Sequence, residues 1–418
     1  MRFDEFGFER GIQDAVDAMN FTECTPIQEK AIPVIMEGRD LIGVAQTGTG
    51  KTAAYLLPVL NSLANGGYPE NAVNCVIMSP TRELAQQIDQ QVEGFSYFAS
   101  VSSVAVYGGN DGIRFEQEKR GMAMGTDILI ATPGRLISHL SLGNCDLSKV
   151  SFFILDEADR MLDMGFYDDI MQIVSRLPKK RQTLLFSATM PPEIQKLAGA
   201  ILDNPVEVKL AVSKPAEKIL QAAYVCYEIQ KVPIIQSLFE DKKERRVIIF
   251  ASSKLKVKEI TKTLRRIGLN VGEMHSDLDQ SQRDEVMLSF RSGHTNILVA
   301  TDIVSRGIDI DDIDLVINFD VPHEAEDYVH RIGRTARAGS DGCAITFVVP
   351  EEQTQFAAIE KFIERDVYKI PIPTEFGETP EYKPFRKSSG RKSGSGHKSG
   401  PGRKPGRGGF RKQRQEKS

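Results

Sequence analysis

Short apolar runs rich in β-branched residues alternate with longer amphipathic segments along most of this 418-residue chain. Runs of this length are typical of buried strands, and the segments between them have the periodicity of helices. The alternation predicts an α/β fold in which helices connect parallel strands. In the first half, the predicted strands are 40–45, 73–79, 127–131, 152–155 and 183–187. In the second half, they are 247–251, 296–301, 315–319 and 343–349.

A polar stretch separates the two series of strands. After Pro205 the chain runs through 211–217, which has little hydrophobic pattern, and the alternation then restarts. Two cores also suit the length of the chain, because single cores stop growing beyond about 250–300 residues. We therefore predict a first domain over 1–208, a linker over 209–220, a second domain over 221–370 and a tail over 371–418.

The net charge of −4 conceals a strongly basic C-terminus. Residues 383–418 hold 13 Lys/Arg and one acidic residue, so the rest of the chain holds 40 Lys/Arg against 56 Asp/Glu, a net charge of −16. This terminal segment consists mainly of Gly, Ser, Pro, Lys and Arg, which cannot form a core, and it is predicted to be disordered. A basic arm of this kind usually contacts a polyanion. The alternative is a solubilising or targeting tail.

Several classes of protein are disfavoured by the sequence. The five cysteines are scattered without metal-ligand spacing and are predicted to be reduced, packed thiols. No run of about 18 apolar residues occurs, and the first residues lack the basic-then-apolar layout of a secretory signal. We therefore expect a cytoplasmic protein that does not associate with membranes.

A glycine-rich loop follows the first predicted strand and precedes a helical segment. Backbone N–H groups in such a loop turn toward phosphates, Lys51 supplies a cation for β- and γ-phosphate oxygens, and Thr52 offers a hydroxyl to Mg²⁺. Ala45 stands where the first glycine of the usual pattern lies. The alternative is a turn that binds no ligand. The residues predicted to bind the nucleotide are Gln46, Thr47, Gly48, Thr49, Gly50, Lys51 and Thr52.

A second apolar strand, 152–155, ends in the sequence Asp156-Glu157-Ala158-Asp159. Asp156 is predicted to hold Mg²⁺ through its water shell, and Glu157 to orient and deprotonate the attacking water. The alternative is the acidic start of a helix, where carboxylates interact favourably with the helix dipole. Together with Lys51, these carboxylates favour ATP hydrolysis.

With these two motifs, the chain resembles the DEAD-box family of ATP-dependent RNA helicases, whose name is residues 156–159 in one-letter code. The resemblance covers roughly residues 3–350, with further motifs in the order that the family has. It implies two tandem RecA-like parallel-sheet domains, ATP and Mg²⁺ as cofactors, and RNA as the partner.

The resemblance also implies how adenine is recognised. Segment 21–28 is similar to the adenine-reading segment of the family, in which Gln28 would hydrogen-bond the adenine edge and Phe3 would pack on the base. An amide can donate and accept at once, which suits adenine. Asn20 stands where the family usually has glycine, and asparagine also tolerates left-handed backbone.

Further segments resemble the RNA-side motifs of the family. In the first domain these are 80–85, 108–109 and 132–135, and in the second domain they are 250–253, 280–283 and 300–309. Contacts of this kind position the RNA backbone without reading its sequence. The residues that the resemblance assigns to RNA are Thr81, Arg82, Gly109, Thr132, Arg135, Thr301 and Arg306, and Asp309 would touch the ribose.

Two last segments concern coupling and catalysis. Ser187-Ala188-Thr189 resembles the motif that hydrogen-bonds Asp159 and couples the ATP state to RNA binding, although a Ser-x-Thr pair also caps helices. Segment 330–337 is similar to the family's final motif, in which Arg334 and Arg337 would reach the γ-phosphate as arginine fingers. Ala336 stands where the family commonly has glycine.

The distribution of these motifs predicts a mechanism. The phosphate loop and the acids lie in the first domain and the arginines in the second, so catalysis would require a closed cleft and cooperative binding of ATP and RNA. The resemblance implies local opening of a duplex and release after hydrolysis. We expect a monomer that acts on single-stranded RNA and short duplexes, with ribonucleoprotein partners. The alternatives are an ATP-gated RNA clamp or assembly scaffold, and a DNA helicase on the same fold.

Overall fold

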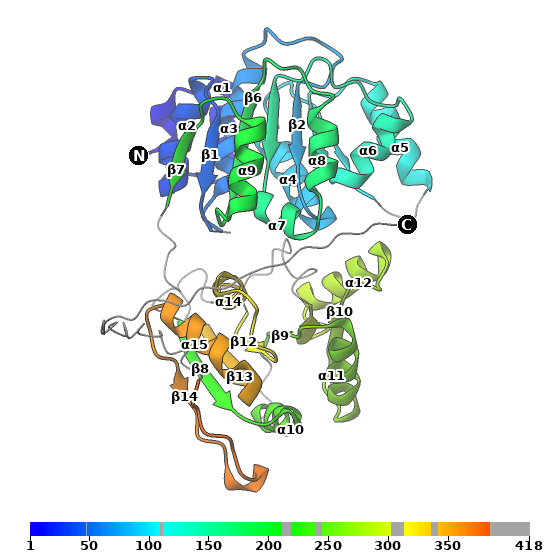
Figure 1. Ribbon diagram of the computed structural model, residues 1–418. Helices are drawn as coiled ribbons and strands as arrows, with labels where there is room; N and C mark the ends of the chain where they lie inside the picture. Colours follow the sequence, from blue (N-terminus) through cyan, green and yellow to red (C-terminus); the bar gives the residue numbers. More distant parts are fainter. Residues whose placement is uncertain are drawn as a thin grey trace, which may run out of the picture.

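The computed structural model describes residues 1–46, 48–108, 112–210, 219–239, 245–301, 313–335 and 342–384. Among these residues, two separate seven-stranded sheets form, one in each half of the chain (Figure 1). Helices cover both faces of each sheet, and neighbouring strands are parallel throughout. The prediction of an α/β fold with two parallel-sheet domains is confirmed.

The first sheet has the strand order β3-β4-β2-β5-β6-β1-β7. The five predicted runs form its centre, and the two strands outside those runs, β3 and β7, lie at its edges. Only one residue of each edge strand is fully buried, so an apolar run does not mark them. The strands are β1 (Leu41–Val44), β2 (Cys75–Met78), β3 (Ser103–Val106), β4 (Ile128–Ala131), β5 (Phe152–Leu155), β6 (Gln182–Ser187) and β7 (Val206–Lys209).

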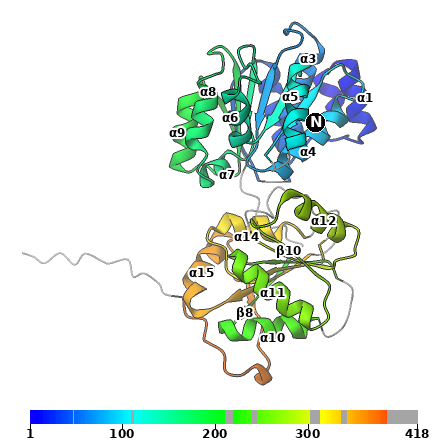
Figure 2. The same ribbon diagram turned by 90° about the vertical axis from the view of Figure 1, so that its right-hand side faces the viewer.

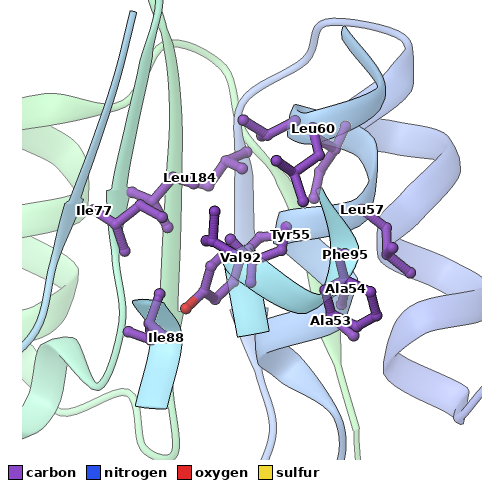
Figure 3. Close-up of a cluster of buried hydrophobic side chains, with 14 of the residues drawn as sticks. Ala53, Ala54, Tyr55, Leu57, Leu60, Ile77, Ile88, Val92, Phe95 and Leu184 are labelled. Carbon is purple, nitrogen blue, oxygen red and sulfur yellow. The ribbon is translucent and has the colours of Figure 1, made fainter. Parts of the chain in front are cut away.

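Two apolar clusters hold the helices of the first domain against the sheet. One contains buried side chains of α1 to α4, including Tyr55, Leu60 and Phe95, packed on Ile77 and Leu184 of the sheet (Figure 3). The other joins α5 to α9 to the opposite face. The helices are η1 (Phe3–Phe6), α1 (Arg10–Ala18), α2 (Pro26–Met36), α3 (Lys51–Ala64), α4 (Arg82–Phe95), α5 (Gly112–Ala123), α6 (Pro133–Ser141), α7 (Ala158–Asp163), α8 (Tyr167–Val174) and α9 (Pro192–Ile201).

The second sheet has the order β10-β11-β9-β12-β13-β8-β14. The four predicted runs are β9, β11, β12 and β13, which are again central strands. The residue bounds are β8 (Ile219–Val225), β9 (Val247–Phe250), β10 (Val271–Met274), β11 (Ile297–Ala300), β12 (Leu315–Asn318), β13 (Gly342–Val348) and β14 (Tyr368–Lys369).

Helices of the second domain also divide between the two faces of their sheet. One apolar cluster contains residues of α12, α14 and α15, and the other contains residues of α10 and α11. The helices are α10 (Glu228–Leu238), α11 (Lys254–Arg266), α12 (Gln280–Arg291), α14 (Ala325–Ile332), η2 (Pro350–Glu352), α15 (Gln353–Phe362) and η3 (Thr374–Phe376).

The predicted linker over 209–220 is too long at both ends. Lys209 is the last residue of β7, and Ile219 is the first residue of β8. Residues 211–218 lie outside the described residues.

The predicted tail over 371–418 is wrong in its first part, because residues up to 384 pack on the second domain. The Gln230 side-chain amide donates to the carbonyl oxygens of Phe376 at 2.7 Å and Glu378 at 3.1 Å. Near the end of this segment, the Lys383 backbone N–H donates to Gln353 Oε1 at 2.7 Å. Hydrogen bonds to backbone groups produce no hydrophobic pattern in the sequence. The composition of this segment therefore did not indicate that it packs on the domain. Residues 385–418 lie outside the described part of the chain.

Two further observations concern the expected class of protein. All five cysteines are free, and Cys75 and Cys226 are buried. Within the described residues, no helix combines the length and the apolar character that crossing a membrane requires.

Candidate functional site

The glycine-rich loop joins β1 to α3, so it lies at a helix N-terminus beside the carboxyl end of a central strand. Gly48 and Gly50 have φ of 82° and 86°, a left-handed conformation that favours glycine. Lys51 is only 6% exposed, and its Nζ donates to the Ala45 carbonyl oxygen at 2.7 Å. An ammonium group has three donors, so two remain for phosphate oxygens. Thr47 lies outside the described residues.

Asp156 and Glu157 follow β5, which lies two strands from β1 in the sheet. Asp156 is 2% exposed, and its Oδ1 accepts the Glu157 backbone N–H at 2.9 Å. Burial raises the pKa of Asp156 to about 6, although the nearby charge of Lys51 lowers it. Glu157 has a φ of 51°, which is strained for a residue with a side chain and turns the chain sharply between strand and helix.

Tyr55 is a residue of this site that the sequence reasoning missed. It lies in α3 one turn after Lys51, is fully buried, and donates its hydroxyl to Asp156 Oδ2 at 2.9 Å. A hydrogen bond with Thr52 also acts on this hydroxyl and lowers the pKa of Tyr55, although burial raises that pKa well above its usual value. The sequence offered one signal for this contact, a tyrosine at a core position of a helix. A buried tyrosine hydroxyl needs a hydrogen-bond partner, so such a position predicts a polar group nearby.

The donor set at this site suits Mg²⁺. The Thr52 hydroxyl and the Asp156 carboxylate are hard oxygen donors, and Mg²⁺ in nucleotide sites typically uses one or two protein oxygens with water and phosphate. Tyr55 and the Glu157 N–H each occupy one lone pair of Asp156, which leaves acceptor capacity on both carboxylate oxygens. The residues present therefore fit the ion that the sequence predicts.

A cavity of about 580 Å³ opens beside these residues, and both domains line it. Figure 2 shows α7 of the first domain facing α14 of the second across this region. The first domain contributes Lys51, Glu157 and Asp159, and the second contributes His330 and Arg334. Three of the four predicted catalytic residues are thus brought to one cavity. The fourth, Arg337, lies outside the described residues, as does Asp309.

Glu157 and Arg334 are both positioned for chemistry in this cavity. Glu157 Oε2 lies 3.6 Å from Arg160 Nη1 and has no hydrogen-bond partner in the described part of the chain. An acceptor in this state can take a proton from water. Arg334 follows α14 and is 8% exposed, so its charge is held at the cavity wall rather than in bulk solvent.

The predicted adenine residues have different environments. Gln28 is 2% exposed; its Nε2 donates to the Gly50 carbonyl oxygen at 3.1 Å, and its Oε1 accepts the Thr25 N–H at 2.8 Å. Gln28 therefore touches the phosphate loop. Phe3 is 1% exposed and lies edge-to-face with Phe21, with ring centroids 5.8 Å apart, so its ring faces the core and not the cavity. Asn20 adopts the anticipated left-handed conformation, with φ of 59°.

The three predicted coupling residues form one hydrogen-bonded unit. Asp159 Oδ2 accepts the Ala188 N–H at 3.0 Å, the Thr189 N–H at 2.9 Å and the Thr189 hydroxyl at 3.0 Å. The Ser187 hydroxyl donates to the Thr189 carbonyl oxygen at 2.7 Å. The loop after β6 is thereby tied to the acidic loop after β5.

A second cavity, of about 500 Å³, lies between the domains and is called the groove below. It is lined by four of the residues that the resemblance assigned to RNA, namely Thr81, Arg82, Thr132 and Arg135, and by Ser276 and Arg283 of the second domain. Burial and then the charge of Arg283 lower the pKa of Arg82, which marks a concentration of positive charge. Thr301 follows β11 and is 9% exposed, but it does not line the groove. Gly109 and Arg306 lie outside the described residues.

Glu118 supports the groove and was also missed. It is 4% exposed, accepts a hydrogen bond from Arg135 Nε at 2.7 Å, and lies 3.0 Å from His139 Nε2. Phe115 stacks on His139 with ring centroids 4.1 Å apart, and the Arg135 guanidinium lies 4.6 Å from the Phe115 ring centre. The guanidinium of Arg135 is therefore fixed in the groove wall by charge and by stacking.

One ion pair joins the domains at the groove. Arg283 Nη1 of α12 lies 3.3 Å from Glu83 Oε1 of α4, and both side chains are partly exposed, at 19% and 16%. Glu83 is in segment 80–85 and Arg283 in segment 280–283, so the pair connects two RNA-side segments of the resemblance.

Comparison with known proteins agrees with this geometry. Residues 25–197 match the DEAD/DEAH box helicase family, and residues 230–339 match the helicase conserved C-terminal domain. The ATP-dependent RNA helicase CshA of Listeria monocytogenes is 39% identical over 89% of this chain and 71% of its own length. The DEAD-box ATP-dependent RNA helicase RhpA of Helicobacter pylori is 38% identical over 89% of this chain and 74% of its own length.

Solved structures match across both domains. Saccharomyces cerevisiae Dbp5 bound to RNA and ADP BeF3 has a TM-score of 0.77 and 30% identity, covering 88% of this chain and 95% of that one. Mss116p bound to ssRNA and AMP-PNP has a TM-score of 0.78 and 30% identity, covering 90% of this chain and 80% of that one. Likeness in sequence and in fold along both RecA-like domains shows that this chain belongs to the DEAD-box family of ATP-dependent RNA helicases.

Proposed function

We propose that this protein is an RNA-dependent ATPase and helicase that clamps RNA through its backbone, locally separates short duplexes and hydrolyses ATP to ADP and phosphate for release. The observation that carries the proposal is the pair of cavities between the domains. Lys51, Glu157 and Arg334 line one cavity, and Arg82 and Arg135 line the other together with second-domain residues. Each cavity needs both domains to be complete.

The steps of ATP hydrolysis are assigned to residues that line the first cavity and to residues beside it. The loop N–H groups and Lys51 bind the phosphates, and Gln28 is assigned to the adenine edge. Thr52 and Asp156 would hold Mg²⁺, which neutralises phosphate charge when it is bound. Glu157 orients the attacking water and accepts its proton, since its Oε2 is not hydrogen-bonded.

The second domain supplies positive charge to the same reaction. Arg334 stabilises the charge that develops on the transferred phosphoryl group, as a guanidinium at the cavity wall can do without being desolvated further. Arg337 is assigned as the second finger, and Asp309 as a contact for the ribose. These groups act only when the domains lie together, so ATP stabilises the closed arrangement.

RNA binding is proposed for the groove. Thr81, Arg82, Thr132 and Arg135 would contact phosphates, which positions the strand without reading its sequence. Gly109, Thr301 and Arg306 are assigned to the same strand. The groove also needs both domains, so RNA and ATP favour one closed state and must strengthen each other's binding by the same factor. The bonds from Asp159 to Thr189 are the proposed link between the two cavities.

We further propose that the protein acts as a monomer in the cytoplasm, where single-stranded RNA and short duplexes are available, and within ribonucleoprotein particles. The basic segment 383–418 would add non-specific, salt-dependent affinity for the same RNA. Residues of a single chain line both cavities, which supports the monomer.

ATP hydrolysis by the purified protein tests the proposal directly. Turnover is measured without nucleic acid and with single-stranded RNA, duplex RNA or DNA, each beside Glu157→Gln. We expect strong stimulation by RNA, little by DNA, and at least about 100-fold slower turnover in the variant, since a general base contributes that much. Equal stimulation by DNA would reject RNA as the substrate. RNA stimulation without strand separation in a duplex assay would favour the ATP-gated clamp instead.

A further inference from the structure

Helix α11 of the second domain has an unusual charge. Its 13 residues include six Lys/Arg and one acidic residue, whereas residues 1–382 as a whole carry −16. The buried side of the helix, which includes Val257, Ile260 and Leu264, packs on the second sheet. Five exposed cations lie on the remaining surface and are called the α11 stripe: Lys254, Lys258, Lys262, Arg265 and Arg266.

The spacing within the stripe works against the stability of the helix. Lys254, Lys258, Lys262 and Arg266 follow one another at intervals of four residues, and like charges at this spacing destabilise a helix. Asp277 offsets only the first two, with Oδ1 at 2.7 Å from Lys254 Nζ and Oδ2 at 2.8 Å from Lys258 Nζ. Favourable interaction with the helix dipole explains basic residues in the last turn. It does not explain Lys262, which has no ion pair within the described part of the chain.

The far end of the stripe surrounds a shallow hollow of about 440 Å³ beside the edge strand β10. Four cations and one carboxylate, Glu273, line it, together with Thr261, whose buried hydroxyl has no hydrogen-bond partner among the described residues. Arg265 Nε donates to the Val271 carbonyl oxygen at 2.9 Å, which fixes this guanidinium against β10. None of the described residues that line the hollow is apolar, whereas the core of a protein interface usually contains apolar anchors. A polar, strongly positive lining is typical of nucleic-acid surfaces.

The near end of the stripe reaches the groove. Asp277, which Lys254 and Lys258 hold, directly follows Ser276, and Ser276 lines the groove with Arg283. From there α11 extends about 18 Å, at 1.5 Å per residue, away from the first domain (Figure 1). The α11 stripe therefore runs from beside the groove to the hollow.

We propose that the α11 stripe is a second contact for the RNA backbone, which holds phosphates of the strand where it leaves the groove on the second domain. The inference rests on the proposed function, because it takes the groove as the RNA site. It adds an RNA-binding surface outside the segments that resemble family motifs. It also predicts that affinity increases with RNA length beyond what the groove alone can hold.

The test compares two pairs of charge-neutralising substitutions in the full chain. Lys262→Gln with Arg266→Gln removes two cations of the stripe. Lys361→Gln with Arg365→Gln is the matched control, since this exposed pair has the same spacing and lies in and just after α15, on the opposite face of the same sheet. Binding of single-stranded RNAs of increasing length is measured by fluorescence anisotropy across a range of salt concentrations.

We expect the stripe variant to bind long RNA with a slope of log affinity against log salt that is shallower by about 1.4, because each phosphate contact contributes about 0.7 for a single strand. If the two proteins bind equally at 1 M salt, the stripe variant should bind about 25-fold more weakly than the unsubstituted protein at 0.1 M. The shortest RNA and the control variant should behave like the unsubstituted protein. The melting temperature of the stripe variant should be equal or higher, because repulsion within the helix is relieved.

Three results would overturn the inference. The slope of the stripe variant could match that of the unsubstituted protein at every length, or the control variant could lose as much affinity, which would indicate bulk charge. Loss of binding to poly-glutamate with no change for RNA would assign the stripe to an acidic polypeptide. Absence of RNA binding in the unsubstituted protein would instead reject the proposed function, so the two failures are distinguishable.

Discussion

The two cavities between the domains have opposite charge. The one beside the phosphate loop is lined by seven acidic residues against Lys51, Arg160, Arg334 and a histidine, whereas the groove is lined by Arg82, Arg135 and Arg283 against one acid, Glu83. An acidic cavity disfavours a bare polyanion and suits a nucleotide that arrives with a divalent cation. A basic groove suits direct contact with RNA phosphates. Under the proposed function, this contrast keeps the two anionic ligands apart in one cleft.

The two cavities also differ in how their charged groups are held. Asp156 and Asp159 are fixed by neutral donors, the Tyr55 hydroxyl and the backbone and hydroxyl of Thr189. Arg135 is fixed by a buried carboxylate, Glu118. Removing a neutral donor leaves a charge that water or an ion can satisfy, but removing a buried counter-charge leaves an unpaired ion. We therefore expect larger losses of stability on the groove side.

Glu118→Ala should have the largest effect. It leaves Arg135 and His139 without their shared partner, and breaking a buried ion pair in this way costs about 3 kcal/mol or more of unfolding free energy. Urea unfolding measures the loss, with Glu116→Ala, an exposed acid of the same helix, as the control. RNA affinity should fall while nucleotide affinity does not. Equal stability of the two variants would contradict the proposed support of the groove.

The next effect concerns acid stability of the second domain. Burial raises the pKa of Asp320, but Lys231 and hydrogen bonds from Lys256 and Ser252 outweigh it and lower the pKa to about 2. Because the pKa is depressed in the folded state, the stabilisation is present above 3.8, the ordinary pKa of an aspartate, and is lost as pH falls toward 2. The loss is about 2 kcal/mol.

Unfolding followed between pH 5 and 2 by second-domain amide exchange checks this expectation. Asp320→Asn should be less stable at neutral pH and should show a flatter pH dependence in that interval. A pH profile that the substitution leaves unchanged would show that Asp320 has no linkage to folding. Because the Ser252 N–H donates to Asp320 Oδ2 at 2.8 Å, the same residue also fixes segment 250–253.

How much of this structure the sequence predicts depends on how far apart in the sequence the interacting residues lie. The central strands follow from local apolar runs, and β5 has the predicted bounds without change. Lys51, Glu157 and Arg334 belong to short motifs, and all three line one cavity. Each of these features can be recognised from a few consecutive residues. The edge strands β3 and β7 cannot, because only one residue of each is fully buried.

The residues that were missed have distant partners. Tyr55 is separated from Asp156 by 101 residues. Arg283 and Glu83 lie in predicted segments, but their pairing across 200 residues was not predicted. From the sequence alone, Tyr55 could be an ordinary core residue of an apolar helix, and Glu118 could be an ordinary solvated surface residue. Only the fold shows that these polar atoms meet. The order of residues 371–384 was missed for a related reason, since Gln230 and Gln353 bind their backbone groups across the second domain.

Tyr55→Phe should sharpen the comparison on the nucleotide side. It removes the hydrogen bond to the buried Asp156 carboxylate and the one with Thr52, but no charge, and the bond to the carboxylate contributes about 1.5 kcal/mol, a factor of about 10. We expect the Mg²⁺ concentration for half-maximal binding of a fluorescent ADP to rise about 10-fold, with binding in EDTA unchanged. Tyr68→Phe, which removes the hydroxyl of a half-buried tyrosine, is the control. A loss of binding in EDTA as well would indicate damage to the core rather than to the position of Asp156.

The smallest effect is expected where the two domains meet at the groove. Arg283 and Glu83 form a partly exposed ion pair, and such pairs contribute about 1 kcal/mol or less. Because the pair forms between domains, Arg283→Gln and Glu83→Gln should each reduce the mutual strengthening of ATP and RNA binding by about 3-fold, with little change in either affinity measured alone. A double-mutant cycle tests whether the two side chains act as a pair. If they do, the double variant should lose no more of the coupling between ATP and RNA binding than each single variant. If the two losses add instead, each side chain acts on RNA separately, and the groove is held together by the RNA rather than by the pair.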